Sequence, residues 1–210
     1  INNNDPFPLK SGAGSSKGEF EGEAAKADSS TLVYPYSETL LFSEGKVIAE
    51  MPSIQTVCAI GGSPREALLC IGTSDNTSKV TLKNAFSLVK VTVPAGVSSI
   101  AFEGNVSAKG KIIDALAGKA AIDPATGVST AVDSVSTVVV NVPAEGGDVI
   151  FATLPSKMQS GFKLSLRKEG EQLQIIKRYQ LFVSFLTSER GCCPIVLQMC
   201  CRLNELSDNV

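Results

Sequence analysis

The sequence contains no histidine and no tryptophan. Without histidine it has no Ser-His-Asp triad, no Cys-His pair, no imidazole ligand for zinc and no ready general base near neutral pH. Enzymes can use carboxylate pairs or lysines instead, but no carboxylate pair, nucleophile elbow or phosphate-binding loop stands out. We therefore expect a protein that is not an enzyme and that holds no cofactor and no metal.

Clustered positive charge and long apolar runs are also missing. The net charge is −2, and the lysines are scattered singly among acidic residues. A phosphate-binding face needs clustered lysine and arginine, so nucleic acid is not an expected partner. No apolar run approaches the roughly 18 residues of a membrane helix. We therefore expect no membrane-spanning helix in this sequence.

Short apolar and β-branched runs separated by turn residues fill the chain from Phe20 onward. The clearest pair of runs lies within residues 80–105 and is joined by the turn Pro94-Ala95-Gly96. Roughly ten such strands, with no ordinary helix before residue 180, predict an all-β protein built as an antiparallel sandwich. Alternation assigns a set of side chains to the core: Leu82, Leu88, Val91, Val93, Ile100, Phe102, Val138, Val140, Ile150, Phe151, Phe162 and Leu164.

Composition divides the chain into three parts. Residues 1–19 are polar and rich in Gly and Ser, which is typical of a leader or linker. This leader is either a loose terminus or a functional segment, which pairs along a sheet edge or is removed by a protease. Residues 20–180 form the predicted sandwich domain. Residues 181–210 are an atypical tail, in which Pro194 and the apolar residues after it predict a short helical or irregular segment.

The six cysteines are unevenly placed. Cys58 and Cys70 lie in the body, where we expect small buried apolar side chains or, alternatively, a mutual disulfide. The other four crowd the tail in a spacing that is not typical of zinc sites, so we expect no structural zinc there: Cys192, Cys193, Cys200 and Cys201.

Several short pieces of the chain occur in the order found in one family of bacterial surface proteins. They are VYPYS at 33–37, MPSIQ at 51–55, LKNAFSLVK at 82–90, VPAGV at 93–97, FEGN at 102–105, LAGKA at 116–120, FATLP at 151–155 and GF at 161–162. In this series the chain resembles the fimbrillin-like proteins of anaerobic Gram-negative bacteria, over roughly residues 20–166. The Cys-rich tail does not match that family.

The resemblance implies an exported lipoprotein of the cell surface and outer membrane, with a transthyretin-like sandwich. It implies membrane attachment only through an N-terminal lipid anchor that would precede Ile1. It also implies a structural or adhesive subunit of fimbriae, whose partners are other fimbrial subunits or host surface ligands. Subunits of this family are thought to assemble by strand exchange after a protease removes an N-terminal strand, which is a form of β-augmentation. The alternative is a surface lipoprotein of similar fold that binds carbohydrate or a host ligand and does not polymerise.

Four positions are candidate sites. Lys17 is a basic leader residue at which a protease could cut, since the first arginine is Arg65. Ser134 lies in a tripeptide that resembles the O-glycosylation sequon of this bacterial group; the alternative is an ordinary turn before a strand. Tyr34 and Tyr36 flank Pro35 and are either a ligand contact suited to stacking on sugar or packing at a sheet edge.

Overall fold

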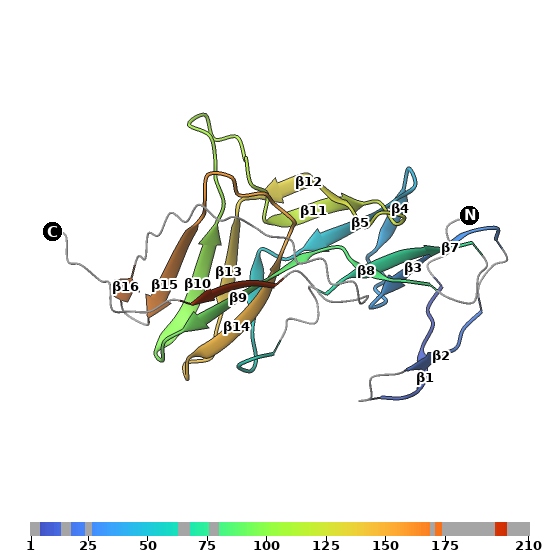
Figure 1. Ribbon diagram of the computed structural model, residues 1–210, viewed down its shortest axis with the longest axis horizontal. Helices are drawn as coiled ribbons and strands as arrows, with labels where there is room; N and C mark the ends of the chain where they lie inside the picture. Colours follow the sequence, from blue (N-terminus) through green and yellow to red (C-terminus); the bar gives the residue numbers. More distant parts are fainter. Residues whose placement is uncertain are drawn as a thin grey trace.

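A computed structural model describes residues 5–13, 18–23, 27–62, 68–75, 80–168, 171–173 and 196–200, the last two ranges by backbone alone. These residues form strands and turns and no helix, which confirms the all-β prediction (Figure 1). The strands are β1 (Leu9–Ser11), β2 (Glu19–Phe20), β3 (Ser30–Tyr34), β4 (Leu41–Ser43), β5 (Lys46–Met51), β6 (Ile54–Thr56), β7 (Cys70–Ser74), β8 (Lys83–Asn84), β9 (Ser87–Val93), β10 (Val97–Glu103), β11 (Ala117–Ile122), β12 (Ser129–Val135), β13 (Thr137–Asn141), β14 (Gly147–Thr153), β15 (Lys163–Lys168), β16 (Glu171–Leu173) and β17 (Val196–Cys200).

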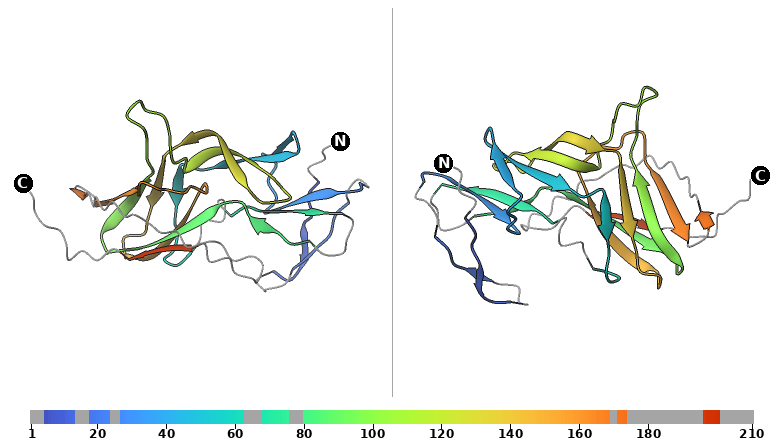
Figure 2. Two further views of the ribbon diagram at one scale, coloured as in Figure 1. Left: turned by 45° about the horizontal axis from the view of Figure 1, so that its top comes forward. Right: turned by 180° about the vertical axis from the view of Figure 1, so that it is seen from behind.

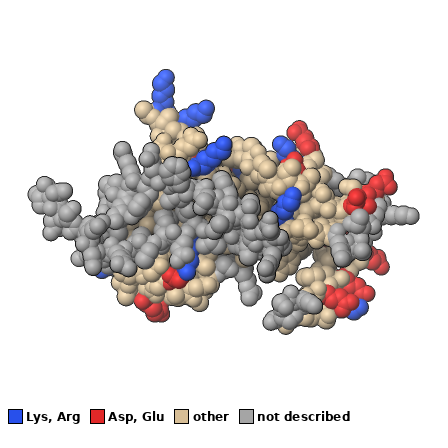
Figure 3. All heavy atoms as spheres, in the orientation of Figure 1, with Lys and Arg blue, Asp and Glu red and all other residues tan. Residues whose placement is uncertain are grey.

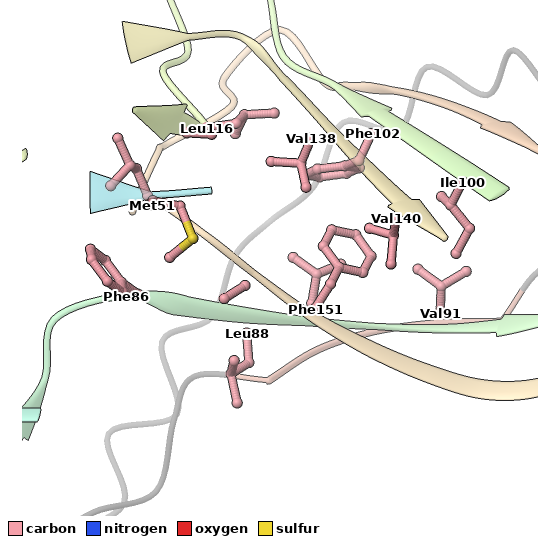
Figure 4. Packing of buried hydrophobic residues seen from close by; sticks show 14 of the residues in the cluster. Met51, Phe86, Leu88, Val91, Ile100, Phe102, Leu116, Val138, Val140 and Phe151 are labelled. Carbon is pink, nitrogen blue, oxygen red and sulfur yellow. The ribbon is translucent and has the colours of Figure 1, made fainter. Parts of the chain in front are cut away.

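Two sheets pack face to face as a sandwich. One has the strand order β16-β15-β10-β13-β6, and the other has the order β14-β9-β17. Figure 4 shows Val91 and Phe151 pointing from the second sheet toward Ile100, Phe102 and Val140 of the first. The ring centroids of Phe102 and Phe151 lie 5.6 Å apart in an edge-to-face contact, which is a favoured geometry for aromatic pairs.

Two further sheets extend the sandwich toward the N-terminal end of the molecule. The four-stranded sheet β12-β11-β5-β4 lies next to the sandwich, and β3-β7-β8 lies beyond it (Figures 1 and 2). Both sheets contribute to one continuous core, through residues such as Met51, Ile71 and Ile122. The order places β3 at a sheet edge, as expected for a strand that runs into Pro35.

Ten of the twelve residues predicted for the core are buried. Leu82 and Ile150 are the exceptions and are half-buried. Ile150 stands in register with Lys90 of β9, and both belong to the face of the sheet that is turned away from the sandwich interior. Leu82 comes just before the short strand β8, at the edge of its sheet. Burial therefore follows the prediction except near edges and outer faces, although Leu88 is buried on the outer face of β9 and not in the sandwich interior.

Two local predictions are wrong. The backbone of residues 196–200 is the strand β17 and not part of a helix, because it pairs with β9, whose edge supplies hydrogen-bonding partners that outweigh the helical spacing. Ser134 lies inside β12 rather than in a turn, because the whole of β12 pairs with β11 and places Ser134 opposite Gly118. The rest of the tail lies outside the described residues.

Candidate interaction surface at the edge of β9

Strand β9 has a core face and an outer face. Val89, Val91 and Val93 are buried. Figure 4 shows Val91 facing the other sheet of the sandwich, and the period-two alternation of a strand puts Val89 and Val93 on the same face. Leu88 points to the opposite side in Figure 4, and it shares that face with Lys90 and Thr92. Such a strand is apolar along its core side over its whole length, which suits a position within a sheet rather than at a bare edge.

The two edges of β9 have different neighbours. On one side β14 pairs antiparallel over the full strand, with Gly147 opposite Val93 and Thr153 opposite Ser87. On the other side β17 pairs parallel, from Val196 opposite Leu88 to Cys200 opposite Thr92. A segment from the far end of the sequence thus completes the outer edge of β9. This edge is the candidate interaction surface.

The outer edge of β14 is closed by a side chain and a loop. The Gln55 side-chain amide donates to the carbonyl of Ala152 (2.7 Å) and accepts from its N–H (3.0 Å), as a neighbouring strand would. Further along, the N–H of Gly61 donates to the carbonyl of Asp148 (2.8 Å). Gln55 is buried, so these bonds are shielded from water. The chain itself therefore blocks strand addition at β14.

Charged side chains fix β9 to β14 on the outer face. The ammonium of Lys90 donates to Asp148 (2.6 Å), and the hydroxyl of Thr92 donates to the other oxygen of the same carboxylate (2.6 Å). These two hydrogen bonds, that from Lys90 above all, hold the pKa of Asp148 below its ordinary value. The β9–β14 pair is therefore tied by side chains as well as by its backbone ladder.

The N-terminal strands pair with each other instead of with the sandwich. Leu9 stands opposite Phe20 in the two-stranded sheet of β1 and β2, and Lys10 forms an ion pair with Glu21 (2.8 Å). This hairpin touches β3 through an edge-to-face contact of Phe20 with Tyr34, at 6.1 Å between ring centroids. The described part of the leader therefore does not lie along an edge of the sandwich, and Lys17 lies outside the described residues.

The other candidate residues lie apart from the β9 edge. Tyr34 and Tyr36 are 53% and 44% exposed, and Tyr34 packs on Phe20. Both therefore present ring surface to solvent at the N-terminal end of the molecule. Ser134 is half-buried on the edge strand β12. The fold does not bring these residues together into one site.

The prediction that Cys58 and Cys70 are buried apolar side chains or a mutual disulfide is wrong. Cys58 is exposed in the loop after β6, so it is not a buried apolar residue. Cys70 is half-buried on β7, where its thiol donates to the side-chain oxygen of Asn84 (2.9 Å). The two cysteines do not form a disulfide with each other. Of the tail cysteines only the backbone of Cys200 is described, on β17.

A buried carboxylate organises the loops at one end of the sandwich. Asp114 is 5% exposed and accepts hydrogen bonds from Asn105 (backbone 3.1 Å, side chain 2.6 Å), Ser156 (2.8 Å) and the Met158 N–H (3.2 Å). Burial alone would raise the pKa of Asp114, but these hydrogen bonds outweigh it and lower the pKa below 3.8. These four hydrogen bonds stabilise the buried charge and hold the loops together.

Acidic and basic side chains gather in different parts of the surface seen in Figure 3. Figure 3 shows acidic side chains gathered over the N-terminal end and lysines on the projecting loop between β10 and β11. That loop carries Lys109 and Lys111, both exposed. Within the described ranges, no group of three or more cysteine or acidic side chains could hold a metal ion. The described residues also include no helix of the length and hydrophobicity required to span a bilayer.

No family model, no curated protein and no solved structure matches this chain.

Proposed function

We propose that this protein is a structural or adhesive subunit of bacterial surface fimbriae, and that it assembles by exchanging a strand at the edge of β9. The ordered resemblance to fimbrillin-like proteins supports the class. The observation that carries the mechanism is the parallel addition of β17, a segment distant in sequence, to an otherwise open edge. In this proposal the sandwich is of the transthyretin-like kind, the protein is exported, and its partners are other fimbrial subunits.

The physical basis of the exchange is β-augmentation. Main-chain hydrogen bonds of an added strand supply affinity, and they can be made equally well by β17 of the same copy or of another copy. Gln55 and Gly61 already occupy the outer edge of β14, so an incoming strand is directed to β9. The five paired positions of β17 and β9 give the exchange a fixed register.

The resemblance to fimbrillin-like proteins implies that removal of the leader precedes assembly. The Gly/Ser-rich sequence around Lys17 is suited to cleavage after that lysine. The hairpin of β1 and β2 contacts the body through the ring of Phe20 on Tyr34. Cleavage at Lys17 would separate β1 from β2 and release the N-terminal half of the hairpin.

A second candidate function is a surface protein that binds carbohydrate or a host ligand and does not polymerise. The exposed rings of Tyr34 and Tyr36 are the observation that favours it, because exposed aromatic faces can stack on sugars. In that case cleavage of the leader would leave the protein monomeric.

The experiment that tests the proposed function is limited trypsin digestion of the full chain, followed by sizing chromatography and negative-stain electron microscopy. We expect assemblies larger than the monomer after cleavage. The variant Gln198→Pro should stay monomeric, because proline removes a backbone donor in the middle of β17. The matched control Ser207→Pro, outside β17, should assemble like the unchanged chain. Monomers in all three samples contradict the proposal.

A further inference from the structure

A polar cavity lies far from the β9 edge, between the sheet β3-β7-β8 and the turn that joins β11 to β12. Its volume is about 440 Å³, within the range of small-molecule pockets. The side chains that matter for its chemistry are Ser29, Thr73, Asp75, Thr81 and Lys83. We propose that this cavity binds a hydroxyl-rich sugar residue, such as the terminal hexose of a glycan.

The cavity is lined mainly by polar groups. Among the described residues, no side-chain hydrogen bond or ion pair engages the carboxylate of Asp75 or the hydroxyls of Ser29, Thr73 and Thr81. These groups line one space in place of the apolar walls that are usual in small-molecule pockets. They therefore select a ligand that offers many donors and acceptors over one that offers apolar surface.

The turn between β11 and β12, which lies opposite the sheet, is held in place by hydrogen bonds within the protein. The Asp123 carboxylate accepts from the N–H groups of Ala125 (2.9 Å) and Thr126 (3.0 Å), which fixes the turn. The ammonium of Lys83 donates to the carbonyl of Ala125 (3.1 Å) and joins the turn to β8. A ligand would therefore meet a shaped site and would not have to order this loop.

The chemistry of the charged groups favours a sugar over a simple ion. An ammonium has three donors, and Lys83 uses one of them on Ala125, so two remain for ligand oxygens. The Asp75 carboxylate can accept from two hydroxyls at once. One acidic and one basic group in the same cavity do not select a small anion or cation, whereas alternating donors and acceptors fit adjacent sugar hydroxyls.

This inference is independent of strand exchange. A sugar site at β3-β7-β8 would serve a polymerising subunit and a monomeric binding protein equally well. It is also distinct from stacking on Tyr34, which lies at the opposite end of β3 from Ser30. Sugar binding is therefore measured on the uncleaved full chain. A failure to bind sugar then leaves the test of assembly unaffected.

The test is a nitrogen–proton NMR titration of the full chain with D-glucose, D-galactose and D-mannose in turn. We expect at least one sugar to shift the amide signals of Thr73, Asp75 and Thr81. Asp75→Asn should weaken that binding about tenfold, since one charge-assisted hydrogen bond is lost. Thr81→Val removes a hydroxyl from another part of the cavity lining and should also weaken binding. Both side chains are exposed and unpartnered, so the variants should keep the fold.

The matched control is Glu145→Gln, which neutralises an exposed carboxylate between β13 and β14 and should bind like the unchanged chain. The inference is overturned if none of the three sugars shifts these amides, or if the shifts centre on Tyr34 and Tyr36. It is also overturned if Asp75→Asn and Thr81→Val bind as well as the control. The same titration is made with the free amino acid glycine. If glycine binds in place of the sugars, the inference is overturned as well.

Discussion

Replacing Gln55 with methionine tests how the sandwich closes its own edge. Methionine keeps the length and volume of glutamine but cannot donate to the carbonyl of Ala152 or accept from its N–H. Ala152 is fully buried, so both backbone groups would lose their partner without gaining water. Each such loss costs about 1–3 kcal/mol. Since methionine recovers some apolar burial, we expect Gln55→Met to lower the free energy of unfolding by about 2–4 kcal/mol.

The assay is urea unfolding followed by amide hydrogen exchange. The midpoint should fall without a change in slope, because the surface exposed on unfolding is similar. The Ala152 amide should exchange faster than its neighbours on β14. The control is Thr56→Val, an exposed position on the same strand, which should change stability by less than about 0.5 kcal/mol. If Gln55→Met is as stable as this control and Ala152 stays protected, the side chain does not close the edge of β14.

Two further substitutions test other parts of the fold. Asp114→Asn should cost about 1.5–3 kcal/mol at neutral pH, as expected for hydrogen bonds to a charged group. Because the pKa of Asp114 is lowered in the folded protein, its contribution is complete above the ordinary value of 3.8 and is lost as the pH falls through the folded-state pKa. Urea titrations should therefore show the two proteins converging in acid, and a constant difference would contradict this. Gly118→Ala should cost about 2 kcal/mol or more, since Gly118 has a φ of +105° and a methyl group there would meet the carbonyl of Asp133. The control is Gly110→Ala, at a φ of +78° with open space around it, because an alanine there has the unfavourable dihedral but no steric clash. Equal thermal stability of the two variants would show that the clash with Asp133 does not destabilise Gly118→Ala.

Local alternation predicted the interior of the sandwich because burial of one face imposes a period of two on the sequence. Phe102 and Leu164 are examples: each lies in a run whose alternate residues are polar or less apolar, and each is buried. The same signal separated β9 from β10 at the turn around Gly96, whose φ of +83° favours glycine. These features depend only on neighbours in the sequence.

Features that depend on distant parts of the chain were not predictable in this way. The bonds between Gln55 and Ala152 join strands far apart in the sequence, and a single glutamine at an inward position of a short strand is a weak signal. Ser134 belongs to a strand because β11 pairs with it, although its own tripeptide favours a turn. The parallel pairing of β17 with β9 was hidden for the same reason. The polar cavity is also assembled from four separate stretches of the chain.

The most direct test of strand exchange is a cross-linking measurement on mixed copies. Position 198 stands in register with Lys90, so a Gln198→Glu carboxylate can be coupled to the Lys90 amine by a zero-length carbodiimide. The ion pair of Lys90 with Asp148 provides an internal reference, since that link must stay within one copy. Isotope-labelled and unlabelled protein are mixed, cleaved with trypsin, cross-linked and analysed by mass spectrometry. The account predicts mixed-isotope links between positions 90 and 198 at the share expected for random mixing, beside single-isotope links between Lys90 and Asp148. If the links to position 198 are also single-isotope throughout, β17 stays in its own copy and the account is contradicted.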